Sequence, residues 1–200
     1  GRAEVSFSGG DREIVDAVVV CIGTRTALDC LAPEQVEIDR GVVVDEHMQT
    51  SVPDLFAAGD CCQGRDLSIE GTRLIGLWAN AGAQGDCAGR NMAGQFCRYY
   101  GNILHNITHF FDMDFIGLGD PNLPGERCSF REKGFTVEAI LEDGKLNSIN
   151  LFGNYRISGI LKNHLTKRLL GGEARLTPAQ QGLLAAGGLS RAFIRRIGGE

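Results

Sequence analysis

The stretch TSVPDLFAAGD, residues 50–60, decides how this chain is expected to fold. Val52 precedes a proline and is therefore pushed towards an extended conformation, and the Pro-Asp pair that follows it can open a turn. Leu55–Ala58 is a short apolar run bounded by turn residues, which predicts a strand buried on both faces. Asp60 should then lie at the carboxyl end of that strand, where open α/β sheets bind their ligands.

The end of this segment has the composition of a ligand site. Ala57, Ala58 and Gly59 carry little or no side chain, so a flat or phosphorylated ligand can approach their backbone closely. The carboxylate of Asp60 only accepts hydrogen bonds, which suits the hydroxyl groups of a polyol. Taken alone, the four residues AAGD could equally close a buried strand at a turn, so the neighbouring segments must decide between the two interpretations.

The whole segment resembles the second flavin-contacting motif of the FAD-dependent pyridine nucleotide-disulphide oxidoreductases. The family pattern is Thr-Ser, Pro-Asp and then Phe-Ala-Ala-Gly-Asp, and each part occurs here in that order. The resemblance implies that Asp60 bonds a ribitol hydroxyl of FAD and that Gly59 and Cys61 lie beside the cofactor.

Upstream of the motif, two segments are expected to pair as strands. Residues 4–10 and Arg12–Gly23 alternate in polarity around a Gly-Gly-Asp turn, which predicts a β-hairpin. Val18–Val20 is a continuous β-branched run and predicts a buried strand. In the family such a strand ends the NAD(P)-binding domain, which implies that Gly23 lies near the nicotinamide nucleotide. The family usually has a proline where this chain has Thr26.

Residues 40–50 resemble the family's short exposed strand that leads into the motif, and residues 74–94 resemble the helix that follows it. One face of this helix repeats at spacings of three and four residues, and its small side chains predict close packing against a sheet. The residues of this face are Trp78, Ala81, Gly82, Gly85, Ala88, Gly89 and Met92.

The start of the same helix is the second part of the expected flavin site. The resemblance implies that Gly76, Leu77 and Trp78 point at the flavin ring, where free N–H groups and the helix dipole would stabilise the negative charge of reduced flavin. A tightly packed core helix with Trp78 as a buried anchor would explain the small-residue face equally well.

No glycine cluster in the chain has the G-x-G-x-x-G spacing between a strand and a helix that FAD and NAD(P) domains normally need. We therefore expect the carboxyl-terminal part of a longer enzyme. Residues 1–28 would be the tail of a NAD(P)-binding domain, residues 29–105 the second part of an FAD-binding domain, and residues 106–200 an interface domain. Such a chain should bind FAD weakly or not at all.

The last part of the sequence changes to alternating segments. Residues 128–154 contain three of them, and Asp143-Gly144 is a strong hairpin signal between the last two, so an antiparallel meander with one buried face is expected. Helices should follow in residues 157–172, from the capping pair Thr177-Pro178 onwards, and in residues 189–197.

The expected fold class is therefore mixed. It combines α/β remnants of Rossmann-like FAD- and NAD(P)-binding domains with an α+β interface domain that has an antiparallel sheet and C-terminal helices. By resemblance, the interface domain implies a homodimer.

Thiol chemistry is not favoured by the cysteine pattern. The seven cysteines are odd in number and contain no C-x-x-C pair, which is typical of reduced cytosolic thiols. Cys62 replaces the family's usual alanine after Cys61, but adjacent cysteines can form only a strained ring. The redox-active cysteines of the disulphide reductases lie outside the part of the family that this chain resembles.

A metal site is not expected either. His105 and His109 could bind a metal together on a helix, with Asp112 and Asp114 nearby. However, residues 107–119 alternate as one strand, which would place His109 on the opposite face from both carboxylates. The other two histidines, His47 and His164, are expected at the surface.

Composition narrows the possible partners. A net charge of −5 argues against binding of nucleic acid. No apolar run approaches the roughly 18 residues that span a bilayer, and no signal peptide is visible, so we expect a cytoplasmic protein without a membrane partner.

Three functions compete at this point. The first is part of a flavoenzyme that passes hydride from NAD(P)H to FAD and electrons to an acceptor that the sequence does not identify. The second is a non-enzymatic module for dimerisation or for docking of an electron carrier, whose sign would be an exposed apolar patch. The third, a small hydrolase-like domain, is disfavoured because the chain has no G-x-S-x-G elbow.

Overall fold

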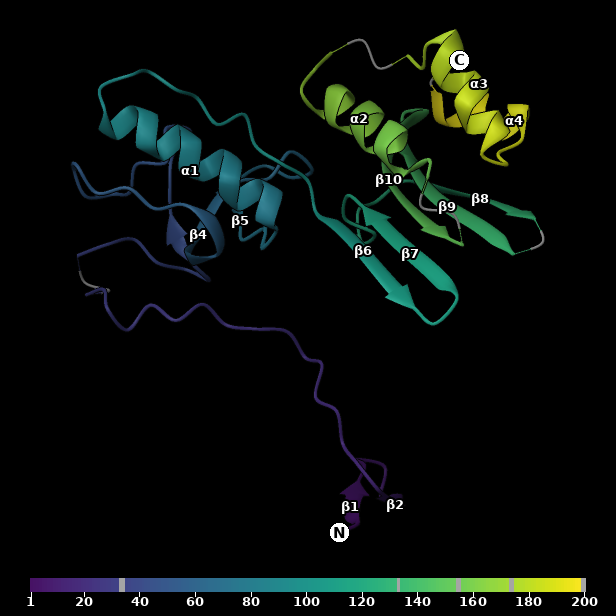
Figure 1. Cartoon of the computed structure of the whole chain (residues 1–200), viewed down its shortest axis with the longest axis horizontal. Coiled ribbons are helices and arrows are strands. Elements are labelled where there is room, and N and C mark those ends of the chain that lie inside the picture. Colours follow the sequence, from purple (N-terminus) through teal and green to yellow (C-terminus); the bar gives the residue numbers. More distant parts are fainter. Residues whose placement is uncertain (33–34, 133, 154–155, 173–174, 199–200) are drawn as a thin grey trace.

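The computed structural model describes residues 1–32, 35–132, 134–153, 156–172 and 175–198. Two bodies lie side by side, each with its own hydrophobic core (Figure 1). An amino-terminal hairpin stands apart from them at the end of an extended segment, the stem, which includes Val18–Val20. The predicted class, a mixed fold of helices and sheets with an antiparallel-sheet domain at the carboxyl-terminal end, is confirmed.

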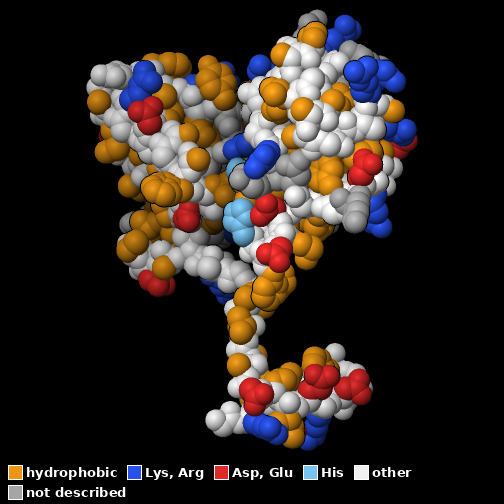
Figure 2. Space-filling model, turned by 45° about the vertical axis from the view of Figure 1, so that its right-hand side comes forward, with side chains coloured by type: hydrophobic (Ala, Val, Ile, Leu, Met, Phe, Trp, Pro, Cys, Tyr) orange, Lys and Arg blue, Asp and Glu red, His pale blue; other side chains and the backbone are white. Residues whose placement is uncertain are grey.

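The amino-terminal hairpin is confirmed, because β1 (Ala3–Ser6) and β2 (Arg12–Val15) pair antiparallel. The predicted buried strand at Val18–Val20 is wrong: these residues form no strand, and Val19 is 82% exposed. A strand needs a hydrogen-bonded neighbour, and no described segment runs beside this part of the stem. Figure 2 shows the stem as a thin column of largely hydrophobic side chains.

The first body contains a three-stranded sheet in the order β3-β4-β5. β3 (Val42–Val43) runs parallel to β4 (Cys62–Arg65), and β5 (Thr72–Arg73) lies antiparallel to β4 on its other side. Helix α1 (Trp78–Met92) packs against the short 3-10 helix η1 (Gly59–Cys61), which directly precedes β4.

The strand predicted at Leu55–Ala58 is wrong. These residues are half-buried and form no strand; Phe56 makes only an isolated bridge with Gln49. Met48 and Asp54 have positive φ angles of 63° and 61°, so the chain folds back on itself as a loop. Asp60 consequently lies just before β4, on η1, and not at the carboxyl end of a strand.

The strand expected in residues 40–50 exists as β3, but its predicted exposure is wrong. Val42 is 2% exposed and Val44 is 4% exposed. Both pack with Met48 and Tyr99 in the core of the first body. β3 is buried because this core closes around it.

Helix α1 forms as predicted, but most of its predicted packing face is wrong. A Cβ atom on Gly82, Gly85 or Gly89 would meet no atom within 4 Å, and Trp78 is 94% exposed rather than a buried anchor. Of the predicted face only Ala88 is fully buried, and the helix otherwise buries Asn80, Gln84 and Cys87. The two amide side chains turn inward because each bonds to backbone of the loops beside the sheet.

The second body is a five-stranded antiparallel sheet in the order β6-β7-β10-β9-β8. Helices α2 and α4 pack against β10, and α3 packs against α4 (Figure 1). The elements are β6 (His105–Phe110), β7 (Met113–Leu118), β8 (Glu126–Glu132), β9 (Phe135–Glu142), β10 (Lys145–Phe152), α2 (Ser158–Leu169), α3 (Pro178–Ala186) and α4 (Arg191–Gly198). The predicted meander and all three helices are confirmed, although residues 133 and 154 of the predicted meander lie outside the described residues.

Local signals in this body are confirmed in detail. Asp143 and Gly144 both have positive φ, 49° and 72°, as the tight turn between β9 and β10 requires. Thr177 caps α3: its Oγ1 accepts the Gln180 N–H over 3.3 Å, and the Gln180 side chain accepts the Thr177 N–H over 2.9 Å.

Two predictions about histidines are wrong. Residues 107–119 turn at Phe111 and form the hairpin β6–β7, which places His109 opposite Asp114 with Nδ1 2.5 Å from Oδ1. Alternation cannot distinguish one long strand from two strands joined by a tight turn. His164 is only 4% exposed because α2 packs beside α4, and its Nε2 lies 3.0 Å from the Ile197 carbonyl oxygen. Among the described residues, no group of three or more His, Cys, Asp or Glu could hold a metal ion.

Candidate cofactor site

The turn that carries Asp60 is held against helix α1 by a buried amide. The Gly59 N–H donates to Oε1 of Gln84 over 2.8 Å. Gly59 has a φ of 83°, and a Cβ atom there would lie 3.3 Å from the Ala81 side chain. Glycine therefore permits both the backbone conformation and the close approach of this turn to the helix. Asp60 itself is exposed.

The start of α1 lies beside the Asp60 carboxylate. A Cβ atom on Gly76 would be 3.6 Å from a carboxylate oxygen of Asp60. Asn80 holds this segment in place, because its side-chain N–H donates to the Ile75 carbonyl over 3.0 Å. The N-cap residue, Leu77, has no polar side chain that could bond the first N–H groups of the helix.

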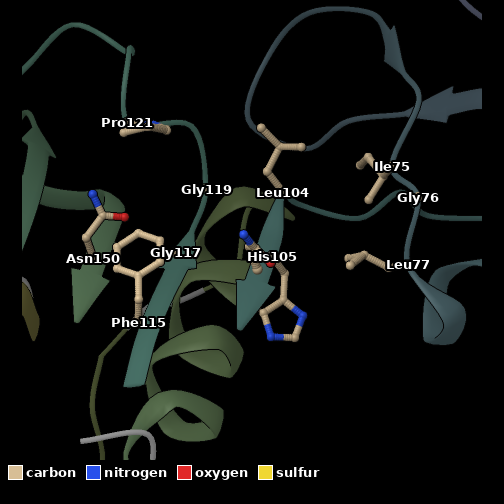
Figure 3. Close-up of a pocket in the computed structure, with 11 residues that line it drawn as sticks. Ile75, Gly76, Leu77, Leu104, His105, Phe115, Gly117, Gly119, Pro121 and Asn150 are labelled. Atoms are coloured by element: carbon tan, nitrogen blue, oxygen red, sulfur yellow. The ribbon is translucent and has the colours of Figure 1, made fainter. Parts of the chain in front are cut away.

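A cavity of about 350 Å³ opens beside this helix start, between the two bodies (Figure 3). Ile75, Gly76 and Leu77 line it from the first body. The second body contributes residues of β6, β7 and β10, among them His105, Phe115 and Asn150. The cavity therefore offers an apolar space flanked by an exposed carboxylate and by N–H groups without a side-chain cap.

Arg73 joins the two bodies at the side of this cavity. Its guanidinium lies 3.1 Å from the fully buried carboxylate of Asp66 and 2.9 Å from that of Asp120, which comes from the second body. Burial alone would raise the pKa of Asp120, but the Asn122 N–H and Arg73 outweigh it and hold this pKa below 3.8. The arginine thus fixes the spacing of the cavity walls.

The cysteines next to Asp60 do not form a redox pair. All seven cysteines are free, and the Cys61 thiol donates to the Ala58 carbonyl over 3.2 Å. Burial, with a smaller effect of Cys61, raises the pKa of Cys62 to about 12. A thiol that stays protonated is a poor nucleophile, so Cys62 serves as a small core residue.

The structure brings together most of the predicted site residues, but not all. Gly59, Asp60 and Cys61 on η1 lie beside Gly76, Leu77 and Trp78 at the start of α1. Gly23 instead lines a separate cavity of about 910 Å³ near the stem. Thr26, which stands in place of the family's proline, donates from its hydroxyl to the Asp60 carbonyl over 3.0 Å.

Sequence reasoning missed the residues that hold the site together. Asn80 and Gln84 stand four residues apart in a helix otherwise rich in alanine and glycine, and this spacing was the available signal for a polar buried face. The roles of Arg73 and His105 had no such signal, because both depend on contacts between the two bodies.

One family of known proteins matches this chain. Residues 1–85 match the family model described as pyridine nucleotide-disulphide oxidoreductase. The matched part of the chain, residues 1–85, belongs to this family. It is 37% identical over 160 residues to an NADH oxidase of Enterococcus faecalis, covering 79% of this chain and 35% of that protein. It is 26% identical over 155 residues to the NADH-rubredoxin oxidoreductase of Clostridium acetobutylicum, covering 76% and 39%.

A solved structure from the same family has a similar fold over most of this chain. The crystal structure of a FAD-dependent pyridine nucleotide-disulphide oxidoreductase from Desulfovibrio vulgaris matches with a TM-score of 0.69 and 21% identity, over 85% of this chain and 45% of that one. The chain therefore spans less than half the length of these relatives. None of the helices in the described residues is both long and apolar enough to cross a bilayer.

The Arg73 link predicts a pH-dependent loss of stability in Asp120→Asn. The folded-state pKa of Asp120 is lowered, so its contribution to the free energy of unfolding is complete above pH 3.8 and is lost as the pH falls through the lowered pKa. We expect the variant to lose about 1–3 kcal/mol at neutral pH. The deficit should shrink under acid, as measured by urea unfolding at a series of pH values. The control is Asp86→Asn, whose carboxylate is 70% exposed; a deficit in Asp120→Asn that does not change with pH would contradict the account.

Proposed function

We propose that this chain forms one wall of the FAD site of an NAD(P)H-dependent oxidoreductase. The observation that carries the proposal is the position of the Asp60 carboxylate beside Gly76, at the uncapped start of α1 and next to an open cavity. The family match and the NADH-dependent relatives support the same reaction class. The electron acceptor of this chain is not identified.

In this proposal, the residues of the chain bind and orient the cofactor. Asp60 accepts a hydrogen bond from a ribitol hydroxyl, and Gly59 and Cys61 hold the turn that presents it. The Leu77 N–H already donates to the Ile75 carbonyl over 2.9 Å, so in this proposal the N–H groups of Gly76 and Trp78 donate to the electron-rich edge of the flavin. When bound, FAD would accept a hydride from NAD(P)H and pass the electrons on, and the protein supplies the positions. Gly23 would lie towards the nicotinamide nucleotide.

We further propose that the chain acts as the carboxyl-terminal part of a longer, cytoplasmic enzyme. It carries no G-x-G-x-x-G turn for either pyrophosphate, and it spans less than half of its relatives. The chain alone should therefore bind FAD weakly and should not oxidise NAD(P)H. Residues 1–28, 29–105 and 106–200 would be the NAD(P)-domain tail, the second part of the FAD domain and the interface domain.

The FAD proposal predicts weak, Asp60-dependent binding near Trp78. Trp78 is the single tryptophan and is 94% exposed at the helix start, so its fluorescence lifetime reports a flavin bound beside it. We expect saturable shortening with a dissociation constant on the order of 0.1–1 mM. Asp60→Ala should weaken binding about tenfold, because a charge-assisted hydrogen bond is lost.

Asp86→Ala is the matched control. The Asp86 carboxylate is exposed on helix α1, which begins at Trp78, and lies away from the turn that carries Asp60. Equal FAD binding by the two variants would show that Asp60 does not bind FAD. A Trp78 fluorescence lifetime that does not change when FAD is added would contradict the whole proposed site. Micromolar binding by the wild-type chain would contradict the idea that half of the site is contributed by other residues.

A second candidate function, dimerisation through the interface domain, is favoured by an exposed apolar surface on the β6–β7 hairpin. Phe111 is 90% exposed, Phe110 61% and Met113 59%. Among the described strands, β6 is an edge of its sheet. We propose that this surface joins two copies of the chain, because an apolar patch beside an open strand edge favours association.

Phe111→Asn tests the dimer without disturbing the turn, because asparagine tolerates the positive φ of 51° at this position. Sedimentation velocity should show a dimer for the wild-type chain and a monomer for the variant. Met92→Ser, which alters an exposed apolar residue of α1, should leave the dimer intact. A monomeric wild-type chain would contradict this second function.

A further inference from the structure

A lysine and a histidine form a pair at the wall of the cavity that faces helix α1. His105 stands at the start of β6 and lines the cavity. Lys162 lies on α2, and its ammonium nitrogen is 3.2 Å from Nδ1 of His105. Both side chains are half-buried. Figure 3 shows the His105 ring on the opposite side of the cavity from Leu77.

The chemistry of the pair fixes the position of the imidazole proton. An ammonium group has three donors and no acceptor, so Nδ1 of His105 must accept and the ring proton must be on Nε2. Burial lowers the pKa of Lys162, while burial and the lysine charge lower the pKa of His105 below 6.5. At neutral pH the histidine is therefore mainly neutral.

Neither member of the pair is neutralised by an acid. In the described part of the chain, no carboxylate oxygen forms an ion pair within 4.0 Å of Lys162 or His105, and Nε2 of His105 has no hydrogen-bond partner. The second body thus brings an uncompensated positive charge and an available N–H to the cavity. The uncapped start of α1 brings further N–H groups from the other side.

We propose that Lys162 holds His105 in its Nε2–H form, and that His105 thereby donates a hydrogen bond to the negatively charged reduced form of a flavin in this cavity. The inference rests on the proposed FAD site and adds a positioning lysine and a binding histidine from the interface domain. An N–H donor backed by a positive charge binds an anion more tightly than a neutral ligand of the same shape. Reduced flavin is therefore the preferred ligand of the site.

The first test uses the chain without any cofactor. Nitrogen-15 NMR of the labelled histidine rings should show His105 with an unprotonated Nδ1 and a protonated Nε2. In Lys162→Met the two tautomers should become mixed, whereas Lys167→Met, which changes an exposed lysine of the same helix, should have no effect. A proton on Nδ1 in the wild-type chain would overturn the inference and would leave the FAD site untouched.

The second test compares oxidised FAD with chemically reduced FAD under anaerobic conditions. The wild-type chain should bind reduced FAD more tightly, and His105→Phe should lower this preference about tenfold. His105→Gln keeps an N–H donor and should retain much of the preference. Asp60→Ala should weaken both forms equally, because a ribitol contact does not sense the charge of the ring.

The outcomes separate this inference from the proposed function. If FAD binds, depends on Asp60 and shows the same preference for reduced FAD in His105→Phe as in the wild-type chain, the inference is wrong and the FAD site stands. If neither form of FAD binds, both fail. Loss of the preference in His105→Phe, together with the Nε2–H tautomer, supports both.

Discussion

The hydrogen bond from the Gly59 N–H to the buried Gln84 side chain is the constraint on which the site depends. It seats the turn that carries Asp60 against α1, and Asn80 on the same helix face holds the Ile75 carbonyl and so the start of the helix. Buried amides are stable only when bonded, so these contacts specify one arrangement of the turn and the helix start. The exposed carboxylate of Asp60 can then face outward beside Gly76.

The second half of the site depends on how the two bodies meet. Arg73 forms ion pairs with carboxylates from both bodies, and a guanidinium between two carboxylates resists sliding more than an apolar contact would. The cavity between the bodies consequently has one wall from the segment that leads into α1 and one from the sheet of the second body. In the proposed site, His105 offers an N–H donor on the second wall and Lys162 stands behind it, so both sides favour an electron-rich ligand.

The sequence predicted those features that a few neighbouring residues determine. The Asp143-Gly144 turn, the Thr177 cap and the helix that begins at Trp78 depend on local backbone preferences, and all three are present. Features that depend on distant neighbours were mispredicted: Leu55–Ala58 has apolar strand composition but folds back as a loop. The glycine face of α1 is exposed because the amides occupy the buried face.

The most direct test of the central claim, that the turn at Asp60 and the start of α1 form a flavin-binding wall, is a map of where FAD touches the chain. Amide chemical shifts of the nitrogen-15-labelled chain would be followed as FAD is added. The account predicts that the largest changes occur at Asp60, Gly76 and Leu77, with smaller changes at Gly117 across the cavity. Changes confined to other surfaces, or equal changes in Asp60→Ala, would contradict it.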